Sequence, residues 1–264
     1  MHTNLTAIFI IVVFLAIIGC EMPIEKKIMK DTKLDNITIV DVYDNVGFDA
    51  KFKTGFGFGA VIKLKDKNIL FDTGGDSPTL LSNLKTAGIK PEDIDIIVLS
   101  HDHADHTGGL LGFLEKNSNV TVYACRSFSS AIKQDIVSAN AKLIEVGKPV
   151  KITEGIYSTG ELGILIKEQS LIINSEKGLI VITGCAHPGV VGIVKKAKEL
   201  MNEEVYLVMG GFHHPSTSVV DEFKGLGVQK VAPSHCTGDE AVEAFAEEYK
   251  EDFIHSGAGK EIRI

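Results

Sequence analysis

The chain has 264 residues, 44% hydrophobic and 23% charged, with 26 glycines and only 7 prolines, a composition that indicates a globular protein and excludes a disordered or collagen-like one. Its 35 acidic residues outnumber its 27 basic ones and give a formal net charge of −8. Because nucleic-acid binding depends on positive charge, no nucleic-acid partner is expected, and we expect a small-molecule substrate instead.

The first 20 residues differ from the rest of the chain. The stretch LTAIFIIVVFLAIIGC, residues 5–20, is an apolar run that ends on a glycine and a cysteine. Such a run is typical of a lipoprotein signal, in which Cys20 becomes the lipidated first residue of the mature protein; an uncleaved membrane anchor is the alternative. Residues 21–35 are charged and aperiodic, which predicts a tether. We therefore expect a membrane-associated, extracytoplasmic protein whose folded domain spans residues 36–264.

The domain opens with strands and a helix. Residues 36–44 (NITIVDVYD) predict a strand, and residues 55–75 predict a hairpin that turns at residues 65–68. Residues 77–89 (SPTLLSNLKTAGI) combine helical spacing of apolar residues with a serine at the N-cap position, so they predict a helix. Residues 94–100 (IDIIVLS) form an almost continuous apolar run, which is typical of a strand covered on both faces.

The remaining residues alternate in the same way, as expected for one α/β domain. Residues 142–184 are rich in strand-like runs, including ILIKEQSLIIN at 164–174 and GLIVITG at 178–184. The other predicted elements are helices at 107–116, 127–134, 190–201, 216–227 and 239–253, and strands at 120–125, 205–211 and 228–235.

Polar side chains follow many of the predicted strands, in turns that carry glycine. Loops beyond strand ends are where α/β proteins assemble their sites, so these turns predict one shared site. The side chains are those of Asp72, His101, His187, His213 and His235.

The densest of these turns reads HDHADH, residues 101–106. Residues leaving a strand alternate in direction, so His101 and His103 can point the same way, whereas Asp105 and His106 fall at the start of the next helix. Two pairs offset in this way can each face a different metal ion. Imidazole and carboxylate ligands suit zinc, and also iron or manganese. We therefore expect one or two divalent ions, with zinc as the first choice.

The motifs FDTGG (71–75), HDHADH (101–106) and a late SH (234–235) resemble the metallo-β-lactamase superfamily. The resemblance implies an α/β (α+β) fold, a four-layer αββα sandwich with a one- or two-metal site between the sheets. Three further motifs, TGCAHPG (183–189), GGFHH (210–214) and PSHCTG (233–238), are similar to a narrower branch. That branch holds the 7,8-dihydropterin-6-methyl-4-(β-D-ribofuranosyl)aminobenzene-5'-phosphate synthases, which are transferases.

The resemblance also implies roles for individual residues. One metal would be held by His101, His103 and His187, and the other by Asp105, His106 and His235. Asp72 would support the histidine loop by hydrogen bonding.

Several nearby residues keep open roles at this stage. Cys185 either bridges the metals or leaves that place to His187, and His213 is either a further ligand or a contact for a substrate phosphate. His214 and Asp102 are expected either to face solvent or to shape loops, and Cys236 is expected to be a small buried residue. No disulfide framework is expected among the cysteines.

The chemistry implied is metal-assisted. A metal-bound hydroxide would attack an ester- or phosphoester-like substrate, and Asp105 would act both as ligand and as proton acceptor. The first expectation is therefore a hydrolase with a small-molecule substrate, phosphorylated or not. A transferase that releases diphosphate and a non-catalytic metal-binding protein are the alternatives.

Overall fold

The computed structural model describes residues 32–264 of the chain. The predicted signal or anchor at residues 1–20 lies outside the described residues, as does most of the predicted tether. Among residues 32–264, no helix combines the length and the apolar character that a membrane span requires.

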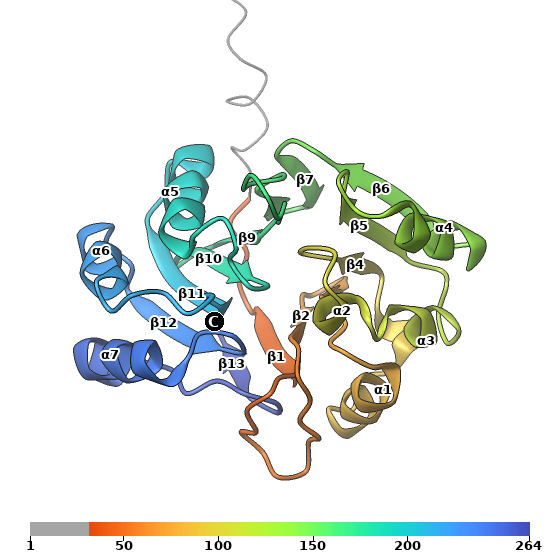
Figure 1. Cartoon of the computed structure of the whole chain (residues 1–264), viewed down its shortest axis with the longest axis horizontal. Helices are drawn as coiled ribbons and strands as arrows, with labels where there is room; N and C mark the ends of the chain where they lie inside the picture. The colour runs from red at the N-terminus through yellow and green to blue at the C-terminus, as the bar shows by residue number, and fades with distance from the viewer. Residues whose placement is uncertain (1–31) are drawn as a thin grey trace, which may run out of the picture.

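Two sheets form the centre of the domain (Figure 1). The first has seven strands in the order β13-β1-β2-β3-β4-β5-β6, antiparallel from β13 to β3 and parallel from β3 to β6. Its strands are β1 (Thr38–Tyr43), β2 (Gly59–Lys63), β3 (Asn68–Phe71), β4 (Ile96–Val98), β5 (Thr121–Cys125), β6 (Lys142–Val146) and β13 (Glu261–Arg263).

The second sheet has six strands in the order β12-β11-β10-β9-β8-β7. Strands β10, β11 and β12 run parallel, and the rest are antiparallel. Its strands are β7 (Val150–Thr153), β8 (Ile156–Ser158), β9 (Leu171–Ser175), β10 (Gly178–Thr183), β11 (Val205–Gly211) and β12 (Lys230–Ser234). The strand expected at 164–174 begins only at Leu171, because residues 163–167 form an exposed loop.

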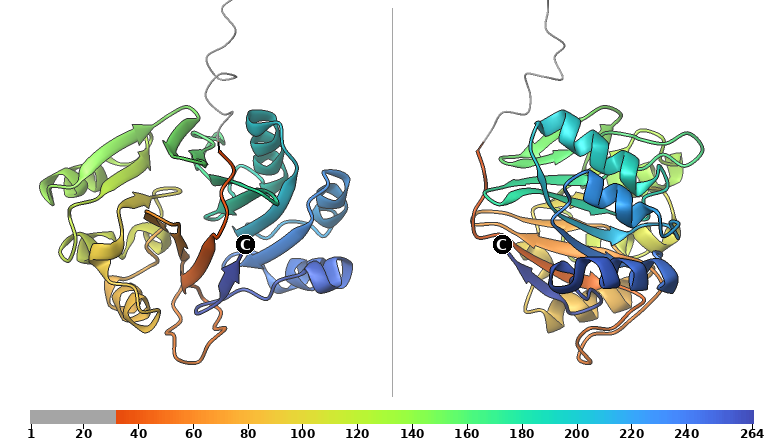
Figure 2. Two further views of the ribbon diagram at one scale, coloured as in Figure 1. Left: turned by 180° about the vertical axis from the view of Figure 1, so that it is seen from behind. Right: turned by 90° about the vertical axis from the view of Figure 1, so that its left-hand side faces the viewer.

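Helices cover the outer face of each sheet, as the two views of Figure 2 show. Those on the first sheet are α1 (Ser77–Thr86), α2 (Ala104–Thr107), α3 (Leu110–Leu114) and α4 (Ser130–Ser138). Those on the second sheet are α5 (Val190–Met201), α6 (Val219–Gly225) and α7 (Asp239–Tyr249). Two single 3₁₀ turns, Pro91–Asp93 and Lys250–Asp252, complete the described elements.

Three separate apolar clusters fill the spaces between these layers. Ile62 and Ile180 belong to the cluster between the two sheets. Leu84 belongs to the cluster under the helices of the first sheet, and Phe245 to the one under the helices of the second. Three cores between four layers confirm the predicted αββα sandwich.

Several predicted helix boundaries were wrong: the helix expected at 127–134 spans Ser130–Ser138, and the one expected at 239–253 ends at Tyr249. Two further corrections have a physical reason. The N-cap of α1 is Asp76, whose carboxylate accepts the Thr79 N–H at 2.7 Å, so Ser77 is already inside the helix. The helix expected at 107–116 is split into α2 and α3 at Gly108. A Cβ on Gly108 would lie 2.1 Å from the carbonyl oxygen of Gly75. Only glycine therefore allows the chain to pass this close to the loop after β3.

Phe245 tests the packing of the second helical layer. Its fully buried ring lies 5.5 Å from that of Phe212 and 5.3 Å from that of Phe223. We expect Phe245→Ala to lower the free energy of unfolding by about 3–5 kcal/mol, because a large cavity would remain. Urea denaturation measures the change. The control is Val137→Ala, since Val137 is 58% exposed; a loss for Phe245→Ala no greater than for this control would contradict the packing described.

Candidate metal centre

The predicted site residues meet where parallel strands of both sheets end. Asp72 follows β3 and His101 follows β4, its parallel neighbour in the first sheet. His187, His213 and His235 follow β10, β11 and β12, which are parallel neighbours in the second. The carboxyl ends of parallel neighbours lie at one edge of a sheet, so each sheet brings its own set to the same edge.

The turns that carry these residues have unusual backbone conformations. Asp72 (φ 55°), His213 (φ 57°) and His235 (φ 50°) all lie in the left-handed region, as does Ala186 (φ 63°) beside His187. Residues other than glycine adopt this backbone conformation at a cost in energy, and such residues concentrate at functional sites.

His101, His103 and His187 form what we call the first metal group. One ligand atom from each lies within 4.8 Å of the others. The ring of His101 lies 4.5 Å from that of His103 and 4.6 Å from that of His187. His101 is fully buried, and its Nε2 has no hydrogen-bond partner.

Asp105, His106, Cys185 and His235 form the second metal group, again with ligand atoms within 4.8 Å of one another. Asp105 Oδ2 lies 3.4 Å from His106 Nε2 and 3.3 Å from His235 Nε2. Cys185 Sγ lies 3.2 Å and 3.4 Å from the same two nitrogens. The two groups are adjacent, since the rings of His101 and His106 are 4.3 Å apart.

Cys185 also belongs to a third set, with His187 and His213. Cys185 therefore lies close to ligand atoms of both metal groups. A thiolate that contacts both ions would have to lie in such a place. His213 is exposed, and its ring lies 4.4 Å from that of His187.

Asp72 fixes the orientation of two imidazoles. Its carboxylate accepts the Ser100 N–H at 2.7 Å, the Ser100 hydroxyl at 2.7 Å and His106 Nδ1 at 2.7 Å. Because the Ser100 hydroxyl donates its only hydrogen to Asp72, it must accept from His101 Nδ1, 2.9 Å away. In His101 and His106 alike, Nε2 is left as the atom available to a metal.

Glu168, which the sequence reasoning missed, plays the same part for the other sheet. This fully buried carboxylate accepts the N–H groups of Cys185 at 3.0 Å, Ala186 at 2.8 Å and His187 at 2.9 Å. It also lies 2.9 Å from His187 Nδ1. These hydrogen bonds outweigh the opposing effect of burial and lower the pKa of Glu168. The one available signal was the short polar stretch at 167–170 between two apolar runs of a strand-rich segment.

Asn45, also missed, orients His235. Its side-chain oxygen lies 2.8 Å from His235 Nδ1, and its amide nitrogen donates to the His235 carbonyl at 2.9 Å. Protein groups thus engage Nδ1 of His101, His106, His187 and His235, as they do in histidines that bind metals through Nε2.

The charges at the centre favour a cation. Burial lowers the pKa of His101, and the neighbouring His106 lowers it further, so His101 stays neutral. Burial opposes protonation of His106, but the carboxylates of Asp72 and Asp105 outweigh it and raise its pKa to about 10. Burial likewise opposes ionisation of Asp105, but hydrogen bonds from His106 and His235 hold its pKa well below its usual range. A divalent ion would take the place of the proton on His106.

A sequence profile of the metallo-β-lactamase superfamily matches residues 54–199. The chain belongs to the metallo-β-lactamase superfamily. It is 32% identical to the 7,8-dihydropterin-6-methyl-4-(β-D-ribofuranosyl)-aminobenzene-5'-phosphate synthase of Methanocaldococcus jannaschii, over 90% of this chain and 100% of that protein. This match supports the branch that the narrower motifs resemble.

Solved structures agree on the fold of this superfamily member. Tm1679, described as a metal-dependent hydrolase of the β-lactamase superfamily, has a TM-score of 0.74 and 25% identity, covering 86% of this chain and 99% of that one. The metallo-β-lactamase fold protein YhfI from Bacillus subtilis has a TM-score of 0.64 and 15% identity, covering 87% and 99%. The superfamily is metal-dependent, and the donor sets described above suit it.

The remaining candidates lie around the centre and outside the two groups. Asp102 accepts the Ser129 N–H at 2.6 Å, at the start of α4. Cys236 is buried, with Sγ 3.7 Å from the Cys185 carbonyl. Cys125, Cys185 and Cys236 are all free thiols, as expected.

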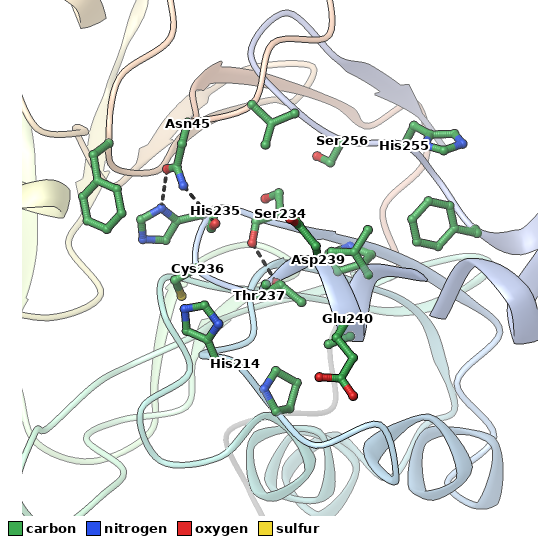
Figure 3. A pocket seen from close by; sticks show the side chains of 18 residues that line it. Asn45, His214, Ser234, His235, Cys236, Thr237, Asp239, Glu240, His255 and Ser256 are labelled. Atoms are coloured by element: carbon green, nitrogen blue, oxygen red, sulfur yellow. Dashed lines mark hydrogen bonds between the residues drawn. The ribbon is translucent and has the colours of Figure 1, made fainter. Parts of the chain in front are cut away.

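A cavity of about 660 Å³ lies beside the second metal group (Figure 3). His235 and Cys236 form one side, and the start of α7 and residues 253–256 form others. Asp239 and Glu240 are its acidic residues, and none of its described lining residues is a lysine or arginine.

We expect Glu168→Gln to weaken metal binding at the first metal group by about 10–100-fold, because the amide nitrogen that replaces one carboxylate oxygen cannot accept hydrogen bonds. Competition with a chromophoric zinc chelator measures the zinc affinity of each metal group. The affinity of the second metal group should change less than that of the first. The control is Glu176→Gln, since Glu176 is exposed. Unchanged affinity at both sites in Glu168→Gln would refute the role given to this carboxylate.

Proposed function

We propose that this protein is a metal-dependent hydrolase of an ester- or phosphoester-like small molecule. The observation that supports it best is the set of imidazoles whose Nδ1 atoms are engaged by buried protein groups. Among them, His101 keeps a buried Nε2 with no partner. Such an arrangement is costly to bury without a cation at its centre.

In this proposal two ions are held by the residue sets described. His101, His103 and His187 would bind one, and Asp105, His106 and His235 the other, with Cys185 between them. Imidazole, carboxylate and thiolate suit zinc best, with iron or manganese as alternatives. When bound, such ions supply a hydroxide nucleophile at neutral pH and polarise the bond to be broken.

Asp105 is the residue that we assign to proton transfer. Its side chain is 19% exposed, whereas those of His106 and His235 are fully buried. It is thus the member of its group that solvent and substrate can reach. Its low pKa keeps it ionised and able to accept a hydrogen bond from the attacking water.

A transferase is the second candidate, and the full-length similarity to the archaeal synthase favours it. In that reading the same centre would assist a diphosphate leaving group. Among the described residues, the cavity beside His235 is lined by no lysine or arginine that could bind such a group, and we therefore place hydrolysis first.

We expect Asp105→Asn to lower hydrolysis by 100-fold or more, because the amide cannot accept the proton. His103→Ala should lower both activity and bound metal. Metal analysis and a panel of small esters and phosphodiesters measure these effects. The transferase assay supplies a dihydropterin methyl diphosphate together with 4-(β-D-ribofuranosyl)aminobenzene 5'-phosphate as the acceptor, and it measures the joined product and the released diphosphate. The control is Asp102→Asn, which keeps an acceptor for Ser129. Full metal and activity in His103→Ala would refute the site, and formation of the joined product without hydrolysis of any ester would favour the transferase.

For the N-terminal segment we propose lipidation at Cys20 and an extracytoplasmic location. Incorporation of radiolabelled palmitate in a bacterial host should occur in the full chain and be lost in Cys20→Ser, while Cys125→Ser keeps the label. An unlabelled full chain would overturn this proposal and would suit a cytosolic transferase better.

A further inference from the structure

Exposed large hydrophobic side chains concentrate in two loops. Seven are exposed among residues 32–264, and five of these lie in the loop after β1 or the loop after β8. The first loop carries Val46, Phe48 and Phe56; the second carries Ile164 and Leu165. The remaining two are Leu111 of α3 and Val137 of α4.

The loop after β1 contacts the second metal group. The ring of Phe56 lies 5.3 Å from that of His235, yet Phe56 is 68% exposed. Asn45 of the same loop holds the His235 ring by its Nδ1. Val46 and Phe56 also line the cavity beside His235.

The loop after β8 contacts the first metal group. Leu162 and Glu168 close its base with backbone hydrogen bonds of 2.9 and 3.1 Å, and Glu168 holds His187. A Cβ on Gly163 would lie 3.3 Å from Pro188, the residue after His187. The two loops therefore flank the centre, each against a different group.

The tip of the second loop is fixed in a shape that exposes its apolar residues. Lys167 Nζ donates to the Gly163 carbonyl at 2.6 Å and so ties the tip across. Within it, Ile164 is 90% exposed and Leu165 is 97% exposed. Exposed apolar side chains gathered beside a site mark a surface that an apolar group covers.

We propose that these two loops hold the aliphatic chain of the substrate, so that the substrate is an acyl ester rather than a phosphorylated molecule. This inference rests on the proposed hydrolase function. The five exposed side chains are themselves apolar, and the cavity that Phe56 lines has, among the described residues, no lysine or arginine to bind a phosphate. In the reaction, the oxygen of water bonds to the acyl carbon and the ester C–O bond breaks, giving a carboxylate, an alcohol and one proton.

Binding is tested apart from turnover. The probe is 11-(dansylamino)undecanoic acid, titrated by fluorescence into the zinc-loaded full chain. We expect Ile164→Ser with Leu165→Ser to weaken binding at least tenfold. The matched control is Leu111→Ser with Val137→Ser, which removes two exposed apolar side chains elsewhere and should change binding less than twofold. Equal losses in the two double variants, or no loss in the first, would overturn the inference.

Turnover of p-nitrophenyl esters from acetate to octanoate gives the second test. Because burying one CH₂ contributes up to about a fourfold change, we expect kcat/KM to rise about two- to fourfold per added CH₂. This increase of kcat/KM with chain length should be smaller in the Ile164→Ser, Leu165→Ser variant. It should be unchanged in the Leu111→Ser, Val137→Ser control. A flat slope in the unaltered chain would overturn the inference. No turnover of any ester, with probe binding intact, would refute the hydrolase but support the chain-binding loops.

Two further measurements address other occupants of these loops. Light scattering that shows a dimer dissociated by Ile164→Ser with Leu165→Ser would overturn the proposal in favour of a second copy. Co-sedimentation of the described domain with phosphatidylcholine vesicles, lost in the same variant, would overturn it in favour of a bilayer. A monomeric protein that does not bind vesicles but does bind the probe supports the proposal that the loops hold the substrate's aliphatic chain.

Discussion

The arrangement of this domain depends on two buried carboxylates that hold imidazoles by Nδ1. Asp72 does so from the end of β3, and Glu168 does so from the loop before β9. Each also accepts backbone N–H groups from the turn that it supports, so the turn and the ring are fixed together. A buried carboxylate is stable only when its acceptors are filled. The hydrogen bonds that offset the cost of burying these carboxylates therefore also orient the imidazole rings, so that Nε2 faces the metal site.

The sequence predicted much of the fold and the centre, because their signals are local. The alternation of apolar runs placed most of the strands, and HDHADH identified the loop after β4. That His187 and His235 share an edge was also predictable, since parallel strands of one sheet end at a common edge. Their meeting with the loop after β4, which belongs to the other sheet, was implied by the resemblance to the superfamily. The comparisons confirm the superfamily and the sandwich.

The features that the sequence could not predict depend on contacts between residues that are far apart in the chain. Asn45 and His235 are 190 residues apart, and no local pattern links them. The pairing of β13 with β1 joins residues from opposite ends of the domain in the same way. Ile164 and Leu165 belong to a run with the apolar character of a strand, but Gly163 and Lys167 close it into an exposed turn. Periodicity reports polarity and not the shape of the backbone.

Both metal groups draw their members from both halves of the sandwich. His101 and His103 come from the first sheet and His187 from the second; Asp105 and His106 face His235 across the same seam. Each bound ion would thus be a cross-link between the two halves. Because the unfolded chain holds no such preformed site, the free energy of metal binding would add to the stability of the folded domain. Disulfides in secreted domains reach the same end by a different route, since they restrict the unfolded chain. The cysteines among the described residues are all free. Bound cations would therefore link the two halves of this domain in the way that disulfide bonds link parts of other proteins.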